Sequence, residues 1–190
     1  KPNSDVHGLG LWDAAAITNQ LTDFIGTAAA DLFRGNARAN TMYGLGGNDW
    51  LESFGGDDLL DGGAGNDTLL GGAGSDTYLF GRGSGSDIVE NENLSGSDLD
   101  TIRLADDVLP ADVTLEATTP RDLALKIFGS SGQLTLNYFL SDPSSRAKQI
   151  VFADGTTWDA ATLMSLATGL ILVGNFRNNE LEGSSLDDQL

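Results

Sequence analysis

The sequence predicts an all-β chain built around a solenoid of short parallel strands. A glycine-rich nonapeptide repeats in register over residues 26–79, and periodic self-similarity of this kind is typical of repeat architectures. An apolar residue recurs at the eighth position of every nonapeptide, which gives the stacked strands a common inward face. Beyond the repeats, "SDIVE", "LDTIRL", "DLALKIF" and "QLTLNYF" alternate apolar and polar residues, as half-buried strands do.

The repeat has two informative positions. Its nonapeptides read "GTAAADLFR", "GNARANTMY", "GLGGNDWLE", "SFGGDDLLD", "GGAGNDTLL" and "GGAGSDTYL". The sixth position holds Asp31, Asn40, Asp49, Asp58, Asp67 and Asp76. The eighth position holds Phe33, Met42, Leu51, Leu60, Leu69 and Tyr78. A disordered glycine-rich linker would not keep an apolar column in step, so we favour a folded repeat.

Each nonapeptide predicts one turn and one short strand. The run from Gly62 to Gly65 can turn tightly because glycine adopts positive φ without steric cost. Thr68-Leu69-Leu70 suits a short strand with Leu69 pointing inward. Two nonapeptides make one coil, and stacked coils place a row of aspartates at each edge. Such rows repel one another without a cation, and hard carboxylate and carbonyl oxygens on flexible turns favour Ca²⁺ over Mg²⁺ or a transition metal.

Composition narrows the function classes. The 190 residues include 28 acids and 10 bases, for a formal charge of −18, which disfavours nucleic acids and anionic membranes as partners. There is no cysteine, hence no disulfide framework and no thiolate metal site. No apolar run approaches the roughly 20 residues that a membrane-spanning helix needs. The chain starts and stops within its own pattern, so we expect it to be a fragment of a longer protein.

Catalytic motifs find no support. His7 is the only histidine, and there is no G-x-S-x-G elbow, P-loop, H-E-x-x-H or EF-hand spacing. "GRGSG" at residues 81–85 lacks a following P-loop lysine and is predicted to be a turn. Trp12, Trp50 and Trp158 could form a sugar-stacking face, but we expect them in the core or its cap. The sequence therefore predicts a chain without catalysis of its own.

The repeats resemble the G-G-x-G-x-D-x-U-x nonapeptide of RTX (repeats-in-toxin) proteins, strongly over residues 44–79 and more loosely over residues 26–43. This resemblance implies a right-handed parallel β-roll with a β-rich cap and one short helix. It also implies Ca²⁺ ions between turns two nonapeptides apart. The earlier turn would give carbonyls from its second and fourth positions, the later turn from its first and third, and both turns their sixth-position aspartates.

Carried onto this sequence, the resemblance implies four ligand sets. The first comprises Leu45, Gly47, Asp49, Gly62, Ala64 and Asp67. The second comprises Phe54, Gly56, Asp58, Gly71, Ala73 and Asp76. The third pairs Gly63, Gly65 and Asp67 with Phe80 or Gly81, Arg82 and Asp87, which lies two residues beyond the strict spacing. The fourth pairs Arg38 and Asn40 with Ser53, Gly55 and Asp58, and is weakened by the neutral Asn40. No site is expected at Asp31, and Asp57 and Asp61 are expected to be solvated.

The flanks predict a tandem arrangement. "FADGTTW" is typical of haemolysin-type calcium-binding proteins, and the segment resembles those that follow nonapeptide arrays in large RTX toxins. Trp12-Asp13-Ala14-Ala15 matches Trp158-Asp159-Ala160-Ala161, and Asn179 and Asp188 resume the repeat spacing. We therefore expect the tail of a preceding block at 1–25, a roll at 26–87, a cap at 88–170 with a helix at 159–168, and a new block from 171.

The predicted function is calcium-driven folding. Acid repulsion and glycine entropy would keep the array unfolded until about three to five Ca²⁺ ions neutralise the turns. The resemblance implies secretion from a Gram-negative bacterium, with neighbouring blocks and a type I secretion apparatus as partners. An adhesin block that binds a surface glycan or protein is the alternative, and an active site elsewhere in the parent is a third. Whether the parent is a toxin, an adhesin or an exported enzyme stays open.

Overall fold

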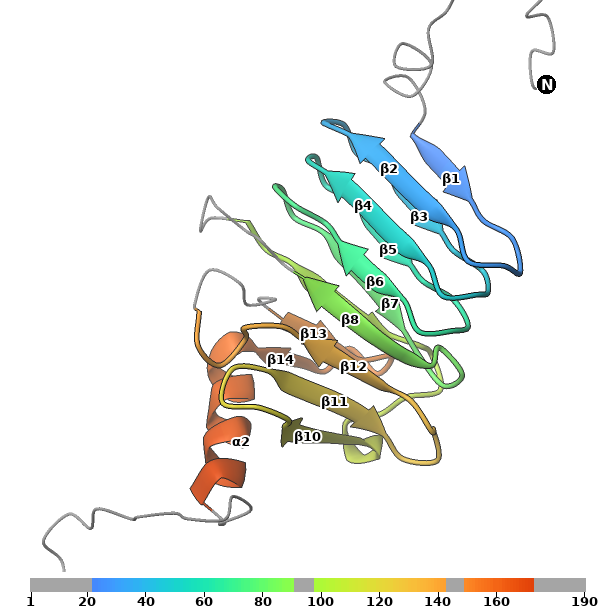
Figure 1. Cartoon of the computed structure of the whole chain (residues 1–190). Coiled ribbons are helices and arrows are strands. Elements are labelled where there is room, and N and C mark those ends of the chain that lie inside the picture. The colour runs from blue at the N-terminus through green and yellow to red at the C-terminus, as the bar shows by residue number, and fades with distance from the viewer. Residues whose placement is uncertain (1–21, 91–97, 143–148, 173–190) are drawn as a thin grey trace, which may run out of the picture.

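Two sheets of seven strands each face one another in this computed structural model, which describes residues 22–90, 98–142 and 149–172 (Figure 1). The first sheet has the order β1 (Asp23–Ile25), β3 (Thr41–Tyr43), β5 (Leu59–Asp61), β7 (Thr77–Phe80), β9 (Thr101–Leu104), β13 (Gln149–Val151), β14 (Thr157–Asp159). The second has the order β10 (Val113–Ala117), β11 (Leu123–Ile127), β12 (Gln133–Leu136), β8 (Ser86–Glu90), β6 (Thr68–Leu70), β4 (Trp50–Phe54), β2 (Leu32–Asn36).

From β1 to β9 the chain winds between the two sheets, one strand at a time. Each strand pairs in parallel with the next strand of its own sheet, so Met42 lies beside Leu60, and Leu51 beside Leu69. We call this part the roll. Its eighth-position side chains from Met42 to Tyr78 are at most 1% exposed and form one narrow core. The predicted all-β class, with strands stacked in a parallel roll, is confirmed.

The last two coils of the roll are longer than the others. Leu69 pairs with Val89, 20 residues on, and Tyr78 pairs with Ile102, 24 residues on. The inward direction of the side chains is unchanged, because Val89 and Ile102 are both buried. The extra residues are accommodated at the turns, so the strand pairing continues through the insertions.

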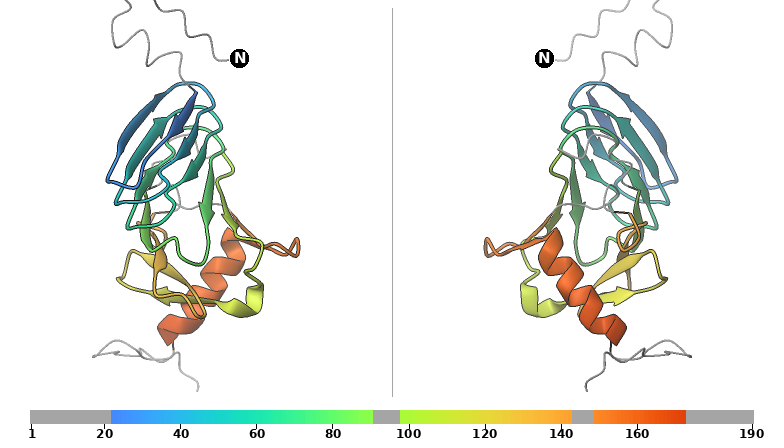
Figure 2. Two further views of the ribbon diagram at one scale, coloured as in Figure 1. Left: turned by 90° about the vertical axis from the view of Figure 1, so that its right-hand side faces the viewer. Right: turned by 90° about the vertical axis from the view of Figure 1, so that its left-hand side faces the viewer.

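Strands β10 to β14 and the helix α2 (Ala160–Leu172) form what we call the cap (Figure 2). The cap continues both sheets: β12 pairs in parallel with β8, and β13 pairs in parallel with β9. Helix α2 packs against β10 and β14. A broad apolar core fills the cap, and its buried side chains include Leu123, Leu125, Leu134, Phe139, Ile150 and Leu163. The end of the roll is thereby covered.

Several local predictions are confirmed. "DLALKIF" and "QLTLNYF" form the antiparallel pair β11–β12. Asp159 begins the helix, because the Thr162 N–H donates to its Oδ1 at 2.7 Å. The side-chain hydrogen bond lowers the pKa of Asp159. In the described part of the chain, no helix is long and apolar enough to span a membrane.

Other predictions need correction. The helix continues past Gly169 to Leu172, since a single glycine costs only about 1 kcal/mol and apolar residues follow it. "AKQIVFADGTTW" contains two strands, β13 and β14, joined by a turn at Gly155 (φ 85°). The first strand of the roll, β1, begins at Asp23 rather than after residue 26. The matches at Trp12–Ala15, Asn179 and Asp188 lie outside the described residues.

Candidate metal centre

Two columns of side chains run along the turn edges of the roll. The Asp49 column contains Asp31, Asp49, Asp67 and Asp87, and precedes the strands of the second sheet. The Asp58 column contains Asn40, Asp58, Asp76 and Asp100, and precedes the strands of the first sheet. In both columns, each main-chain N–H donates to the Oδ1 of the next aspartate, at 2.7–3.0 Å. One oxygen of each accepting carboxylate is therefore used by the fold itself.

The second carboxylate oxygen lacks a partner in four of these residues. The Oδ2 atoms of Asp49, Asp58, Asp67 and Asp76 are buried and make no hydrogen bond, and Asn40 Nδ2 is in the same state. The four aspartates are at most 3% exposed. A buried charged oxygen without a partner costs several kcal/mol. The columns therefore present unsatisfied negative oxygens in a dry environment, which is the condition that a bound cation relieves.

Asp31 behaves differently from the other aspartates. Its Oδ2 accepts hydrogen bonds from the Thr27 N–H at 2.7 Å and the Thr27 hydroxyl at 3.0 Å. The turn "GTAAAD" thus satisfies its own carboxylate. This local pairing supports the expectation that no metal site forms at Asp31.

The first position of the repeat leaves room beside each carboxylate. A Cβ added at Gly44 would overlap Asp49 Oδ2 and the carbonyl oxygen of Gly62. At Gly62 the overlap would be with Asp67 Oδ2, and at Gly71 with Asp76 Oδ2. Glycine is required there because any side chain would fill the space that the orphaned oxygens face. The space is a cradle for an ion that is bound by carboxylate and carbonyl oxygens.

Burial without a counterion also shifts the acidity of the columns. Burial raises the pKa of Asp58 to about 6, and those of Asp76 and Asp87 to about 7. The pKa of Asp67 is raised by burial, and the charge of Asp49 adds to it. Protons therefore take the place of a cation near neutral pH in the metal-free protein.

Side chains alone do not complete a metal site. Within the described ranges, no three His, Cys, Asp or Glu side chains gather around one point. Carbonyl oxygens would have to supply the other ligands, as Ca²⁺ accepts and most transition metals do not. Leu45 and Phe54 take φ values of 72° and 73°, which are strained for side-chain-bearing residues. They stand at the second position of their turns, where the sequence predicts carbonyl ligands.

The first two predicted ligand sets are brought together in space. The Ala64 N–H donates to the Leu45 carbonyl at 2.9 Å, and the Gly47 N–H donates to the Ala64 carbonyl at 3.0 Å. The Phe54, Ala73 and Gly56 peptides repeat this pattern in the other column, with both bonds at 2.9 Å. Each turn therefore lies directly on the turn one coil away, with the paired aspartates beside it. A carbonyl oxygen has two lone pairs, so one remains for an ion.

In the third set the turn is displaced from the predicted positions. Gly65 pairs with Gly85, and the Gly65 N–H donates to the Ser84 carbonyl at 3.0 Å. The coil of 20 residues thus places Arg82 and Ser84 where Gly62 and Ala64 stand one coil earlier, instead of Gly81 and Arg82. The predicted partner Asp87 keeps its place, since the Asp67 N–H donates to its Oδ1. Gly63, like Gly65, has positive φ.

In the fourth set the amide of Asn40 replaces a carboxylate. Its Oδ1 accepts from the Asn36 N–H at 2.9 Å, and its buried Nδ2 has no acceptor. A Cβ at Gly35 would lie close to Asn40 Oδ1 and the Ser53 carbonyl. The other predicted ligands, Arg38 and Gly55, lie in the same stacked turns, where the Gly56 analogue of Cβ would overlap the Arg38 main chain. An NH₂ group cannot ligate a cation, so the charge here is lower.

Sequence reasoning missed Asp100 and the fifth position of the repeat. Asp100 is fully buried and follows Asp76 in its column after an insertion that broke the nine-residue spacing. At the fifth position, the Asn48, Asp57, Asn66 and Ser75 side chains accept from main-chain N–H groups one coil later, at 2.8–3.0 Å. The signal was present, because every one of these side chains is a short hydrogen-bond acceptor.

Three further residues are placed by the structure. Asp57 is exposed, as expected, whereas Asp61 is half-buried and accepts from the Gly63 N–H at 3.1 Å. Burial raises the pKa of Asp61. Trp50 is 41% exposed on the outer face of β4, so the prediction of a core position is wrong for it. Trp158 packs edge-on against Phe152 in the cap, as predicted.

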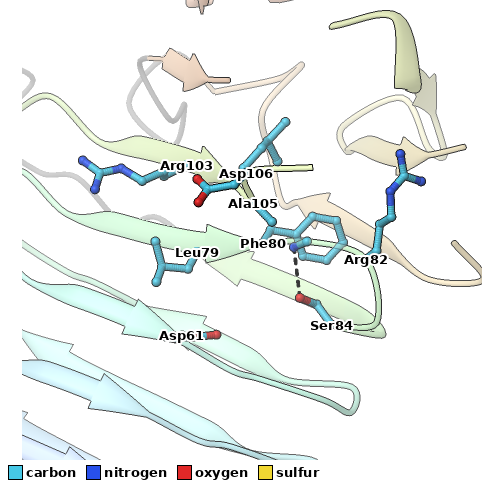
Figure 3. Close-up of a pocket in the computed structure, with 10 residues that line it drawn as sticks. Asp61, Leu79, Phe80, Arg82, Ser84, Arg103, Ala105 and Asp106 are labelled. Atoms are coloured by element: carbon cyan, nitrogen blue, oxygen red, sulfur yellow. Dashed lines mark hydrogen bonds between the residues drawn. The ribbon is translucent and has the colours of Figure 1, made fainter. Parts of the chain in front are cut away.

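A shallow hollow of about 480 Å³ lies where the roll meets the cap (Figure 3). Asp61, Phe80, Arg82, Arg103 and Asp106 are among its lining residues. The Arg82 side chain pairs with Asp107 at 3.1 Å and with Asp112 at 3.2 Å. No member of the two aspartate columns lines this hollow, so it is separate from the candidate metal centre.

Comparison with known families agrees with this geometry. Residues 25–53 and 52–89 match the RTX calcium-binding nonapeptide repeat, and residues 122–162 match the haemolysin-type calcium-binding protein related domain. The chain is an RTX calcium-binding repeat protein. The first match covers the roll and both aspartate columns as far as Asp87. The second covers β11 to the start of α2, and RTX repeat proteins are typically secreted.

A solved structure shows a similar fold. This RTX chain resembles the AlgE6R3 subunit of the mannuronan C5-epimerase from Azotobacter vinelandii, with a TM-score of 0.50 and 22% identity. The similarity covers 90% of this chain and 96% of that one. At this identity the likeness supports the fold alone. The search of curated protein sequences found no match.

Proposed function

We propose that this segment folds by binding several Ca²⁺ ions in its two aspartate columns. The observation that carries the proposal is the set of four buried, unpartnered Oδ2 atoms at Asp49, Asp58, Asp67 and Asp76. Calcium would supply the positive charge that these oxygens lack. The chain contributes carboxylate oxygens, carbonyl oxygens and the glycine spaces beside them.

The ligands follow the stacked turns. In the Asp49 column, we assign Leu45, Gly47 and Asp49 with Gly62, Ala64 and Asp67, and then Gly63, Gly65 and Asp67 with Arg82, Ser84 and Asp87. In the Asp58 column, we assign Phe54, Gly56 and Asp58 with Gly71, Ala73 and Asp76. Arg38 and Asn40 with Ser53, Gly55 and Asp58 form a weaker set. Counting turns gives about three to five ions.

The mechanism converts metal-binding free energy into folding free energy. Without the ion, the columns must hold protons or pay for buried charge, and the glycine turns favour the unfolded chain through their entropy. Outside the cell, where calcium is abundant, the turns close and the roll forms on its cap. This sequence of events suits export through a type I secretion system from a Gram-negative bacterium, with neighbouring RTX blocks attached and without catalysis by the segment itself.

Circular dichroism tests the proposal directly. Protein treated with chelator is titrated with Ca²⁺, and in parallel with Mg²⁺, while the far-ultraviolet spectrum is recorded. We expect a steep gain of β signal with Ca²⁺ and little change with Mg²⁺. A spectrum that is fully β-rich in chelator and unchanged by Ca²⁺ would contradict ion-driven folding.

A second candidate function is a calcium-dependent adhesin block that binds a surface glycan or protein. The exposed face of Trp50, beside the 64%-exposed Leu32, favours it, because aromatic faces stack on sugar rings. A glycan array probed with and without Ca²⁺ tests this candidate. Binding that needs Ca²⁺ and is lost in Trp50→Ala would support it, and no binding to any glycan would remove the sugar-binding form of it.

A further inference from the structure

Two residues of the roll depart from the repeat in chemically similar ways. Ser53 is the one first-position residue in the six nonapeptides that is not glycine. Tyr78 is the one eighth-position residue that carries a polar atom. Both side chains are fully buried, and both are hydroxyls. They lie 25 residues apart in sequence, but they meet at one peptide, that of Gly71.

The Tyr78 hydroxyl reaches from the core to the Asp58 column. Its ring lies in the inward row between Leu60 and Ile102. Its Oη accepts a hydrogen bond from the Gly71 N–H at 3.1 Å. A Cβ added at Gly71 would overlap both Tyr78 Oη and Asp76 Oδ2, so these two oxygens converge on the same small space.

The Ser53 hydroxyl holds the other side of the same glycine. Its Oγ donates to the Gly71 carbonyl at 2.8 Å and lies 3.2 Å from the Leu70 carbonyl. The Gly71 carbonyl is one of the proposed calcium ligands. Gly71 is therefore fixed at its N–H by a tyrosine and at its carbonyl by a serine.

The equivalent glycine of the Asp49 column lacks this arrangement. At Gly62, the three atoms nearest to an added Cβ all belong to Asp67. The first position one coil earlier is Gly44 and the eighth position of the same nonapeptide is Leu69, neither of which has a side-chain oxygen. The two columns thus differ in how far the protein itself fixes the ligand carbonyl.

We propose that Ser53 and Tyr78 are positioning residues that pre-organise the calcium site between Asp58 and Asp76, which consequently binds Ca²⁺ more tightly than the site between Asp49 and Asp67. The inference rests on the proposed function. Its physical basis is that ligands already held in place lose less conformational freedom on binding. The site between Asp58 and Asp76 is then the first to fill, and it nucleates closure of the roll.

Calorimetric titration of Ca²⁺ into the chelator-treated full chain tests the inference. The variants are Tyr78→Phe and Ser53→Ala, which remove one hydroxyl each. The matched controls are Tyr43→Phe, on the half-buried outward Tyr of β3, and Ser86→Ala, on an exposed serine. We expect Tyr78→Phe and Ser53→Ala each to weaken the tightest site by about tenfold, while the other sites and both controls stay as in the wild type.

A background variant separates positioning from general destabilisation. In Asp58→Asn the tight site is already damaged, so adding Tyr78→Phe should change the calcium affinities by less than about twofold. Equal weakening of all sites by Tyr78→Phe, or no weakening of any, would overturn the inference. If the wild type binds no Ca²⁺ at all, the proposed function itself fails, which is a different outcome from a silent Tyr78→Phe.

A spectroscopic measurement covers the case in which Tyr78→Phe does not fold. Near-ultraviolet difference absorbance of the wild type and Tyr43→Phe is followed over the first equivalent of Ca²⁺. We expect a tyrosine signal that saturates at that first equivalent in both proteins, because the Tyr78 hydroxyl contacts the first site to fill. A tyrosine signal that grows evenly over all equivalents would contradict the order of filling.

Discussion

The roll and the cap bury different kinds of side chain, although they share two continuous sheets. Among the described residues, every buried polar or charged side chain belongs to the roll, and these are mostly the column aspartates. The cap buries leucine, isoleucine and phenylalanine from both faces of its hairpins and from α2. Burial of apolar side chains stabilises the cap without a ligand, at about 1.5–3 kcal/mol for each large residue. The roll has a narrow core and buried carboxylates, so its stability depends on a cation.

The largest expected effect comes from removing one carboxylate that two proposed sites share. Asp67→Asn takes a ligand from the site with Asp49 and from the site with Asp87. We expect the calcium concentration at the midpoint of the β transition to rise on the order of a hundredfold, or about 3 kcal/mol. Asp57→Asn, on an exposed neighbour of the Asp58 column, is the control and should shift the midpoint by less than about twofold. Equal shifts in the two variants would remove the distinction between column and surface aspartates.

A truncation in the cap gives a loss of similar size that does not depend on calcium. Leu125 is fully buried on β11, and Leu125→Ala should cost about 3 kcal/mol in the free energy of unfolding. The loss should be the same in chelator and in saturating Ca²⁺, as measured by denaturant unfolding of the cap. A loss seen in Ca²⁺ alone would show that the cap, like the roll, needs the ion to fold.

The effect of pH sharpens the comparison further. The pKa values of Asp58, Asp76 and Asp87 are raised to about 6 or 7, so protonation stabilises the metal-free roll at low pH. This stability is complete below about pH 4 and is lost as the pH rises through 6 to 7. Calcium affinity has the opposite dependence, because protons compete with the ion. We expect the calcium midpoint to rise at least about tenfold from pH 7.5 to pH 5, and a midpoint independent of pH would contradict protonated columns.

The smallest effect is expected at the fifth position of the repeat. Asn48→Ala removes the acceptor for the Asn66 N–H at an exposed turn. The roll should lose about 1 kcal/mol of stability in saturating Ca²⁺, measured by thermal unfolding, with an unchanged number of bound ions. Loss of an ion would mean that the fifth-position side chains belong to the metal centre.

Periodicity in the sequence predicted much of the roll and its edges. The sixth-position column and the eighth-position core both follow from the strict nine-residue spacing between Gly26 and Leu79. Where the chain inserts residues, spacing no longer identifies the partner. Asp100 was missed for this reason, and the turn opposite Gly65 was placed two residues early.

Other features depend on contacts that spacing does not encode. Trp50 is exposed because it occupies the outward seventh position, although its size suggested the core. The meeting of Ser53 and Tyr78 at Gly71 required the actual stacking of three coils. The opposite directions of the fifth-position and sixth-position hydrogen bonds likewise emerge from the turn geometry alone.

Hydrogen–deuterium exchange of individual segments tests most directly whether calcium dependence resides in the roll. Peptides from residues 44–79 and from residues 113–136 are compared in chelator and in saturating Ca²⁺. We predict that roll amides gain protection of at least about a hundredfold on adding Ca²⁺, while cap amides are protected in both conditions. Roll amides that are equally protected in chelator, or cap amides that depend on Ca²⁺ as strongly as the roll, would contradict the account.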